Sequence, residues 1–131
     1  MRYLLDTNIC IALLKGDDRK LTARILSLPP RSIHLCSVVK AELLFGARNS
    51  RRVEDNLERL AKFFEPLQSL PFDDAAANQY GVLRAQQSRD GALIGGNDLL
   101  VAAIALAEDV ALATRNHKEF GRIAGLRLLD W

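Results

Sequence analysis

Apolar and polar residues follow two periods along the chain, and these periods predict strands and helices that alternate. Short apolar runs predict strands at residues 2–5, 32–37, 67–72, 110–114 and 125–130. Apolar residues spaced three or four apart predict helices at residues 8–15, 17–28, 37–48, 50–65, 73–87 and 97–109. The segment RDGALIGG, residues 89–96, is predicted to be a loop because it lacks either period and contains three glycines.

This alternation predicts a single α/β domain over residues 1–131. Consecutive parallel strands need a crossover connection, and a helix between them supplies it. We therefore expect a central, mostly parallel sheet of four to five strands flanked by helices. A length of 131 residues fits one domain, and an apolar content of 49% is enough for a hydrophobic core.

The composition favours a soluble cytoplasmic protein. No apolar stretch approaches the roughly 20 residues that span a bilayer, and the N-terminus has no basic segment and cleavage site of a signal peptide. Cys10 and Cys36 are far apart in sequence and lie in apolar surroundings, which predicts free, buried thiols in a reducing compartment. The net charge of +2 is compatible with an anionic partner but does not by itself indicate one.

Three acidic residues lie where the carboxyl ends of the predicted strands are expected to meet. Asp6 follows the first strand, Glu42 lies about one turn into the helix after the second, and Asp98 opens the helix before the fourth. Asp6 and Asp98 each have an alternative explanation as acids that stabilise the start of a helix. Glu42 lacks this explanation, because apolar residues surround it in SVVKAELLFGA. In open parallel sheets, functional sites lie outside the carboxyl ends of the strands.

Carboxylates that converge at such an edge predict a bound cation. Two like charges about 4 Å apart repel by roughly 4 kcal/mol at an effective dielectric constant near 20, so they share protons or hold a cation. Oxygen ligands with no His or Cys among them favour Mg²⁺ or Mn²⁺ over zinc. Such an ion polarises a phosphodiester and makes its bound water a nucleophile. The pattern indicates phosphodiester hydrolysis, but spacing alone does not establish that the acids converge.

Four blocks stand out along the chain: LLDTNICIALL, SVVKAELLFGA, NDLLVAAIALAED and LATRNHKEFGRIAGLRLLDW. In this order they resemble the PIN-domain ribonucleases, in particular the VapC-type toxins of bacterial toxin–antitoxin pairs. The resemblance implies a PIN-like domain and a Mg²⁺- or Mn²⁺-dependent endoribonuclease (a hydrolase) that cleaves structured RNA, most commonly tRNA. It also implies inhibition by a cognate antitoxin, and a homodimer or a larger toxin–antitoxin assembly.

The resemblance also assigns functional residues by position. The catalytic acids that would bind the metal are Asp6, Glu42 and Asp98. The small polar residues that would orient these ligands are Thr7, Asn8 and Thr114. Asn116 stands where many PIN domains have a fourth acid; its carbonyl oxygen can bind a metal or orient a metal-bound water, so it joins the catalytic set without adding charge. Glu119, three residues further on, is an alternative source of that charge.

Two basic groups are candidates for contact with RNA. The group that flanks Asn116 is predicted to contact phosphates, and consists of Arg115, His117 and Lys118. The second group lies at the end of the predicted helix 37–48, where solvated surface charge is the default explanation, and consists of Arg48, Arg51 and Arg52. Phosphate contacts position RNA without reading its sequence. Only 6% of the residues are aromatic, so no platform for base stacking is evident and recognition of a folded or looped RNA is expected.

Other functional classes fit the sequence less well. A receiver domain needs an acidic pair after the first strand, and a haloacid-dehalogenase-like phosphatase needs Asp-x-Asp, whereas this chain has Asp6-Thr7-Asn8. A non-catalytic PIN-like module that binds RNA or acts as a scaffold is the remaining alternative, because Asn116 replaces the fourth acid.

Overall fold

A computed structural model describes residues 1–91 and 93–131. Within this part of the chain, five strands form one sheet in the order β3-β2-β1-β4-β5, and every pair of neighbours is parallel. The strands are β1 (Tyr3–Leu5), β2 (Ile33–Cys36), β3 (Gln68–Leu70), β4 (Ala111–Ala113) and β5 (Leu128–Leu129). The prediction of a mostly parallel sheet of four to five strands is confirmed. Because all five strands run the same way, their carboxyl ends lie at one edge.

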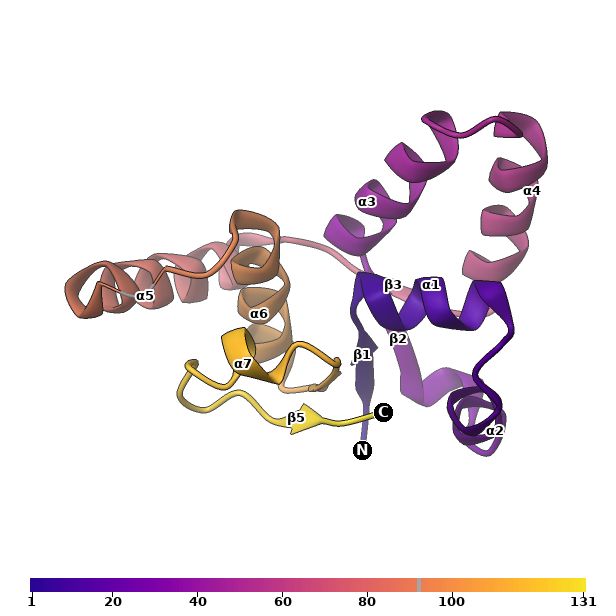
Figure 1. Ribbon diagram of the computed structural model, residues 1–131. Coiled ribbons are helices and arrows are strands. Elements are labelled where there is room, and N and C mark those ends of the chain that lie inside the picture. The colour runs from indigo at the N-terminus through magenta and orange to yellow at the C-terminus, as the bar shows by residue number, and fades with distance from the viewer. Residues whose placement is uncertain (92) are drawn as a thin grey trace.

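The helices connect these strands in the alternating order that the sequence predicts. They are α1 (Thr7–Lys15), α2 (Arg19–Leu26), α3 (Ser37–Arg48), α4 (Val53–Phe64), α5 (Asp74–Asp90), α6 (Gly96–Glu108) and α7 (His117–Phe120). Figure 1 shows α3 and α4 as one projecting pair and α5 and α6 as another, with β1 between them. No helix in the described ranges is both long and apolar enough to cross a bilayer.

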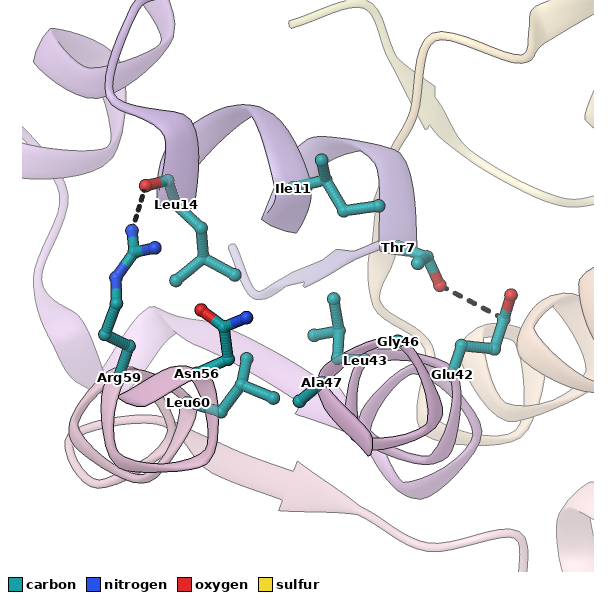
Figure 2. Close-up of a pocket in the computed structure, with 10 residues that line it drawn as sticks. All are labelled: Thr7, Ile11, Leu14, Glu42, Leu43, Gly46, Ala47, Asn56, Arg59 and Leu60. Atoms are coloured by element: carbon teal, nitrogen blue, oxygen red, sulfur yellow. Dashed lines mark hydrogen bonds between the residues drawn. The ribbon is translucent and has the colours of Figure 1, made fainter. Parts of the chain in front are cut away.

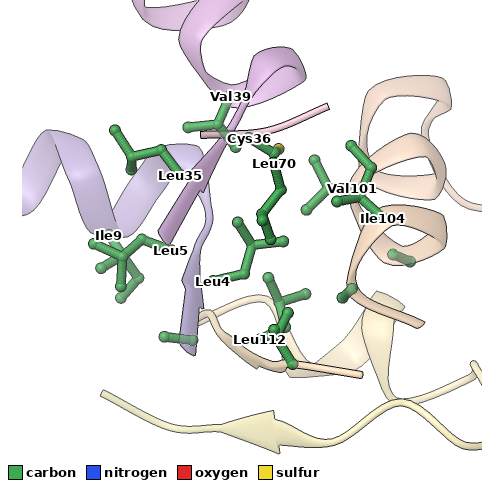
Figure 3. Close-up of a cluster of buried hydrophobic side chains, with 14 of the residues drawn as sticks. Leu4, Leu5, Ile9, Leu35, Cys36, Val39, Leu70, Val101, Ile104 and Leu112 are labelled. Atoms are coloured by element: carbon green, nitrogen blue, oxygen red, sulfur yellow. The ribbon is translucent and has the colours of Figure 1, made fainter. Parts of the chain in front are cut away.

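The core has two layers, one on each face of the sheet. Successive side chains of a strand point to opposite faces, so Leu4 and Leu5 of β1 enter different layers. Figure 3 shows Leu5 beside Ile9 of α1, while Leu4 points toward Val101 and Ile104 of α6. All five side chains are almost completely buried. Helix α6 has apolar residues nearly all round because it packs against both the sheet and α5.

Short local signals fix the ends of several helices. The carboxylate of Asp18 caps α2 by accepting from the backbone N–H of Leu21 at 3.1 Å, and Asp73 caps α5 in the same way. Helix α1 ends at Gly16, whose φ of 72° lies in the left-handed region that glycine adopts without strain. These ends agree with the sequence predictions.

Three local predictions need correction. Helix α5 continues to Asp90, so the loop predicted from residue 89 is shorter; Ala92 lies outside the described residues. Helix α4 begins at Val53 rather than near residue 50, because the hydroxyl of Ser50 donates to the carbonyl of Ala47 and accepts from the side-chain amide of Asn56, which holds Ser50 in a turn. The short helix α7 was not predicted, since four residues are too few to show a helical period.

Candidate active site

Asp6 lies at the carboxyl end of the central strand β1 and is only 6% exposed. Its Oδ1 accepts a hydrogen bond from the backbone N–H of Ile9 at 2.9 Å, so Asp6 caps α1 as the alternative explanation required. Its Oδ2 accepts a second bond from the hydroxyl of Thr114, at the end of β4. Burial raises the pKa of Asp6, and the bonds from Thr114 and Ile9 and the charge of Arg115 oppose that shift.

Glu42 is joined to the start of α1 by one hydrogen bond. The hydroxyl of Thr7 donates to Oε1 of Glu42 at 3.1 Å, across the contact between α1 and α3 (Figure 2). This bond fixes the direction of the Glu42 carboxylate; that Thr7 orients a metal ligand stays a prediction. Asn8 is exposed, and its backbone N–H rather than its side chain acts on Asp6.

Asp98 lies in the first turn of α6, three residues after the helix cap Gly95. Burial raises the pKa of its carboxyl, and the charges of Glu119, Glu42 and Asp6 raise it further, in that order. Three acids from three other segments therefore lie near enough to Asp98 to act on its carboxyl through their charge. We call these residues, Asp6, Glu42, Asp98 and Glu119, the acidic cluster; that they form one metal site stays a prediction.

Glu119 is the member of this cluster that the sequence prediction left outside the catalytic set. It lies in α7, and among the acids it has the largest effect on Asp98. The sequence shows an acid three residues after Asn116, but not that the short helix α7 places its charge near enough to Asp98 to act on it. Asn116 is half-buried at the start of α7, and its backbone N–H donates to the hydroxyl oxygen of Thr114 at 3.0 Å. A catalytic role for the Asn116 side chain stays a prediction.

The acidic cluster suits a hard divalent cation by its chemistry. Its donors are carboxylate oxygens, and their mutual repulsion is the kind that a bound cation relieves. As the side chains lie, however, no three His, Cys, Asp or Glu residues in the described ranges are close enough together to ligate one ion. The residues therefore fit Mg²⁺ or Mn²⁺ in type, and closer approach of the carboxylates is needed before they share an ion.

The three basic residues beside the cluster differ in how they are engaged. Arg115 pairs with Asp18 and also donates to the backbone carbonyl of Trp131, at 3.2 Å from Nε. The Nε2 of His117 lies 3.7 Å from a carboxylate oxygen of Asp130, too far for a hydrogen bond. Lys118 is exposed and has no ion pair within residues 1–91 and 93–131. Of the three, Lys118 is the most available for a phosphate.

A pocket of about 200 Å³ opens beside Glu42, between α1, α3 and α4 (Figure 2). Thr7 and Glu42 lie at one end, and Asn56 and Arg59 at the other. Its walls are largely apolar and include Ile11, Leu14, Leu43 and Leu60. Arg59 donates to the carbonyl of Leu14 at 2.5 Å, which ties α4 to the end of α1 at this end of the pocket.

Comparison with known proteins identifies the family to which this site belongs. A family model described as the PIN domain matches residues 3–126 of the chain. The chain belongs to the PIN-domain family. Ribonuclease VapC2 from Rickettsia felis is 39% identical to it over 132 residues, which cover 100% of this chain and 98% of the relative. The tRNA(fMet)-specific endonuclease VapC from Shigella flexneri is 34% identical over 131 residues, with the same coverage.

Solved structures extend this likeness to the whole PIN domain. The DNA-bound VapBC2 of Rickettsia felis contains a chain that matches with a TM-score of 0.94 and 36% identity, covering 100% of this chain and 99% of that one. The DNA-bound VapBC of Salmonella typhimurium matches with a TM-score of 0.94 and 33% identity, covering 100% and 98%. The resemblance to VapC-type proteins that the four sequence blocks indicate is confirmed.

Proposed function

We propose that this PIN domain is a Mg²⁺- or Mn²⁺-dependent endoribonuclease and the toxin of a cytoplasmic toxin–antitoxin pair. The observation that carries the proposal is the acidic cluster at the carboxyl edge of the parallel sheet, where Thr114 holds the carboxylate of Asp6 and Thr7 that of Glu42. Its relatives support the reaction class, because they are named ribonuclease VapC2 and tRNA(fMet)-specific endonuclease VapC. Structured RNA, and tRNA in particular, is therefore the substrate that we propose.

The ion would supply a Lewis acid for the scissile phosphate and lower the pKa of a bound water. Asp6, Glu42 and Asp98 would hold it, with Glu119 or Asn116 completing the set. Thr114 and Thr7 hold the carboxylates of Asp6 and Glu42 in fixed directions through their hydroxyl groups. Lys118, exposed beside the cluster, would bind a phosphate oxygen of the RNA backbone.

We further propose that a cognate antitoxin inhibits this activity. The structural relatives are VapBC complexes, in which the VapC-type chain is accompanied by a partner. The apolar pocket between α1, α3 and α4 ends at Glu42 and Thr7. A peptide segment that fills it would displace water from apolar walls and lie against the acidic cluster. It would therefore obstruct the site directly.

Cleavage of tRNA by the purified chain, free of any antitoxin, tests the proposal. Wild type, Asp6→Asn and Asp98→Asn are compared with Mg²⁺, with Mn²⁺ and with EDTA, and Asp55→Asn on the outer face of α4 is the matched control. We expect metal-dependent cleavage by wild type and the control, and a loss of about 100-fold or more in both site variants.

Two outcomes would contradict the proposal in different ways. Equal cleavage by wild type and both site variants would reveal a contaminating nuclease and remove the site assignment. RNA binding without cleavage by any form would leave the non-catalytic RNA-binding or scaffold module as the better description. Expression of the chain without its antitoxin is expected to arrest growth, and expression of the Asp6→Asn form is not.

A further inference from the structure

Phe45 is an exposed aromatic side chain on the helix that carries Glu42. It is 70% exposed, although an aromatic ring of this size is usually at least partly covered. The buried side of α3 consists of Val39, Leu43 and Ala47, at helical spacing, and Phe45 does not belong to it. The core of the domain therefore gives no reason for an aromatic residue at this position.

The position of Phe45 relates it to the acidic cluster. Residues three apart on a helix are neighbours on its surface, so Phe45 lies beside Glu42 on the same side of α3. At a rise of about 1.5 Å per residue, Phe45 is about 4.5 Å further along the helix axis than Glu42. Figure 1 shows α3 projecting away from the sheet, so this step leads outward from the site.

Arg48 continues the same line. It lies three residues beyond Phe45, in the last turn of α3, and is exposed. Arg51 and Arg52 follow in the connection to α4 and are exposed as well. None of the three arginines forms an ion pair within the described ranges, so their charge is available to an anion.

The chemistry of this surface matches a nucleotide better than an apolar protein surface. The exposed neighbours of Phe45 at helical spacing are Ala41, Arg48 and Asn49, so the ring is flanked by small, cationic and polar groups. The exposed large apolar residues of α3 are Phe45 and Leu44, which is 40% exposed, and these two do not form the extended apolar patch that marks many protein interfaces. A single flat ring next to guanidinium groups is instead the arrangement that stacks an unpaired base and binds its phosphate.

We propose that Phe45 and Arg48 bind an unpaired nucleotide of the substrate RNA next to the phosphate held at the acidic cluster. Phe45 stacks on the base, and Arg48 contacts the phosphate that follows, with Arg51 and Arg52 extending the path. This inference rests on the proposed nuclease function and names the feature of the RNA that the site selects: a base free to leave its stack. The low aromatic content predicts that the chain has no platform for base stacking. Under this proposal the single ring of Phe45 is that platform.

RNA binding in EDTA tests this proposal without cleavage. The probe is a tRNA stem-loop with 2-aminopurine at an unpaired and unstacked position of its loop, where the fluorescence of the base falls when it stacks on a ring. The variants are Phe45→Ala and Phe45→Trp, with Leu26→Ala, an exposed apolar residue on α2, as the matched control. We expect Phe45→Ala to weaken binding roughly tenfold and abolish the quenching, and Phe45→Trp to restore both. Leu26→Ala should bind as wild type does.

Arg48→Ala is expected to weaken the binding of all RNA sequences similarly. It should also reduce the slope of the logarithm of the affinity against the logarithm of the salt concentration by about one. In Mg²⁺, Phe45→Ala should raise KM roughly tenfold with little change in kcat, because the acidic cluster is intact. Binding that depends on Phe45 in a protein without nuclease activity would support this inference while the proposed function fails.

Two results would overturn the inference. The first is unchanged affinity and unchanged quenching for Phe45→Ala. The second is a change in oligomeric mass for Phe45→Ala, measured by light scattering, with RNA affinity unaltered. That result would mean that a second copy of the chain, rather than RNA, covers the ring.

Discussion

The hydroxyl of Thr114 donates a hydrogen bond to the carboxylate of Asp6 and so joins the ends of β4 and β1. The two residues are 108 positions apart in sequence and both are buried. The same hydroxyl oxygen accepts from the backbone N–H of Asn116, which fixes the start of α7. One side chain thus orients the central acid and the segment that brings Glu119 to the cluster.

Replacing Thr114 with Val is expected to reduce both stability and activity. The change keeps the shape of the side chain but leaves a buried carboxylate oxygen without its donor, which costs about 1–3 kcal/mol of unfolding free energy. Urea unfolding measures that loss, and RNA cleavage should fall at least tenfold as Asp6 loses its orientation. Thr114→Ser keeps the hydroxyl and is the control. Wild-type activity in Thr114→Val would show that this bond does not orient the site.

Removing one charge from the acidic cluster is expected to stabilise the fold while it inactivates the enzyme. Asp98→Asn relieves the repulsion from Glu119, Glu42 and Asp6. In EDTA at pH 7.5, the melting temperature should rise by about 3 °C, corresponding to roughly 1 kcal/mol in a chain of this size. Adding Mg²⁺ should stabilise wild type more than Asp98→Asn, since an ion bound to the native state adds its binding free energy.

The exposed acid Asp55 on α4 provides the comparison for this stability measurement. Asp55→Asn lies outside the cluster and removes a favourable charge from the first turn of α4, so its melting temperature should not rise and its response to Mg²⁺ should match that of wild type. A lower melting temperature for Asp98→Asn than for wild type in EDTA would mean that Asp98 supports the fold through contacts that outweigh the repulsion.

The sequence predicts the architecture well because the signals for it are local. The period-2 and period-3.6 patterns place β1, α3 and α6 within a residue or two of where they lie, and the helix caps Asp18 and Asp73 are recognisable from residue type and position. The all-parallel arrangement follows from alternating elements. These features depend only on residues that are close together in the sequence, so one sequence is enough to recognise them.

The acidic cluster depends instead on contacts between distant segments, and the sequence predicts it only partly. Asp6, Glu42 and Asp98 are found because each stands at a recognisable position relative to a strand or helix. Glu119 is predicted only as an alternative, because α7 is one turn long and too short to show a helical period in the sequence. The pairing of Arg115 with Asp18 and Trp131 is equally invisible in the sequence, and it alters the role expected for Arg115.

Glu119 and Asn116 are rivals for the fourth position of the cluster, and their variants should separate them. Glu119 acts on Asp98 through its charge, so Glu119→Gln should lower metal-dependent cleavage about 100-fold and weaken the stabilisation by Mg²⁺. Asn116→Ala keeps the backbone N–H that bonds Thr114 and should lose less than tenfold. Both are measured as kcat/KM over a range of Mg²⁺ concentrations. The reverse order of losses would assign the fourth position to Asn116.

Arg115 and Lys118 are expected to differ although both flank the site. Lys118→Ala should raise KM for RNA several-fold and reduce the salt slope of binding by about one, because a free cation next to the cluster is lost. Arg115→Ala should instead lower the melting temperature, since Arg115 links α2 to the C-terminal Trp131, and change the salt slope less. An equal loss of salt slope in both variants would show that Arg115 leaves Asp18 to bind RNA.

His34 is a buried histidine outside the site. It is 1% exposed in β2, between Leu4 of β1 and Gln68 of β3, and neither ring nitrogen has a hydrogen-bond partner within the described residues. Burial lowers the pKa of His34, the nearby charge of Arg2 lowers it further, and Glu108 opposes both. The native state therefore holds His34 neutral at a pH where the unfolded chain would protonate it.

Replacing His34 with Leu should make the domain more stable, and increasingly so as the pH falls. At pH 7.5 the gain is about 1 kcal/mol, because two unpaired polar atoms leave the core. Below the ordinary histidine pKa of 6.5, the unfolded wild-type chain binds a proton that the native state does not. The stability difference between His34→Leu and wild type should then widen by up to about 1.4 kcal/mol per pH unit until the lowered native pKa is reached. Urea unfolding between pH 7.5 and 4.5 measures this difference. The control is His117→Leu, a change at a partly exposed histidine. A constant difference across that range would show that His34 titrates alike in both states.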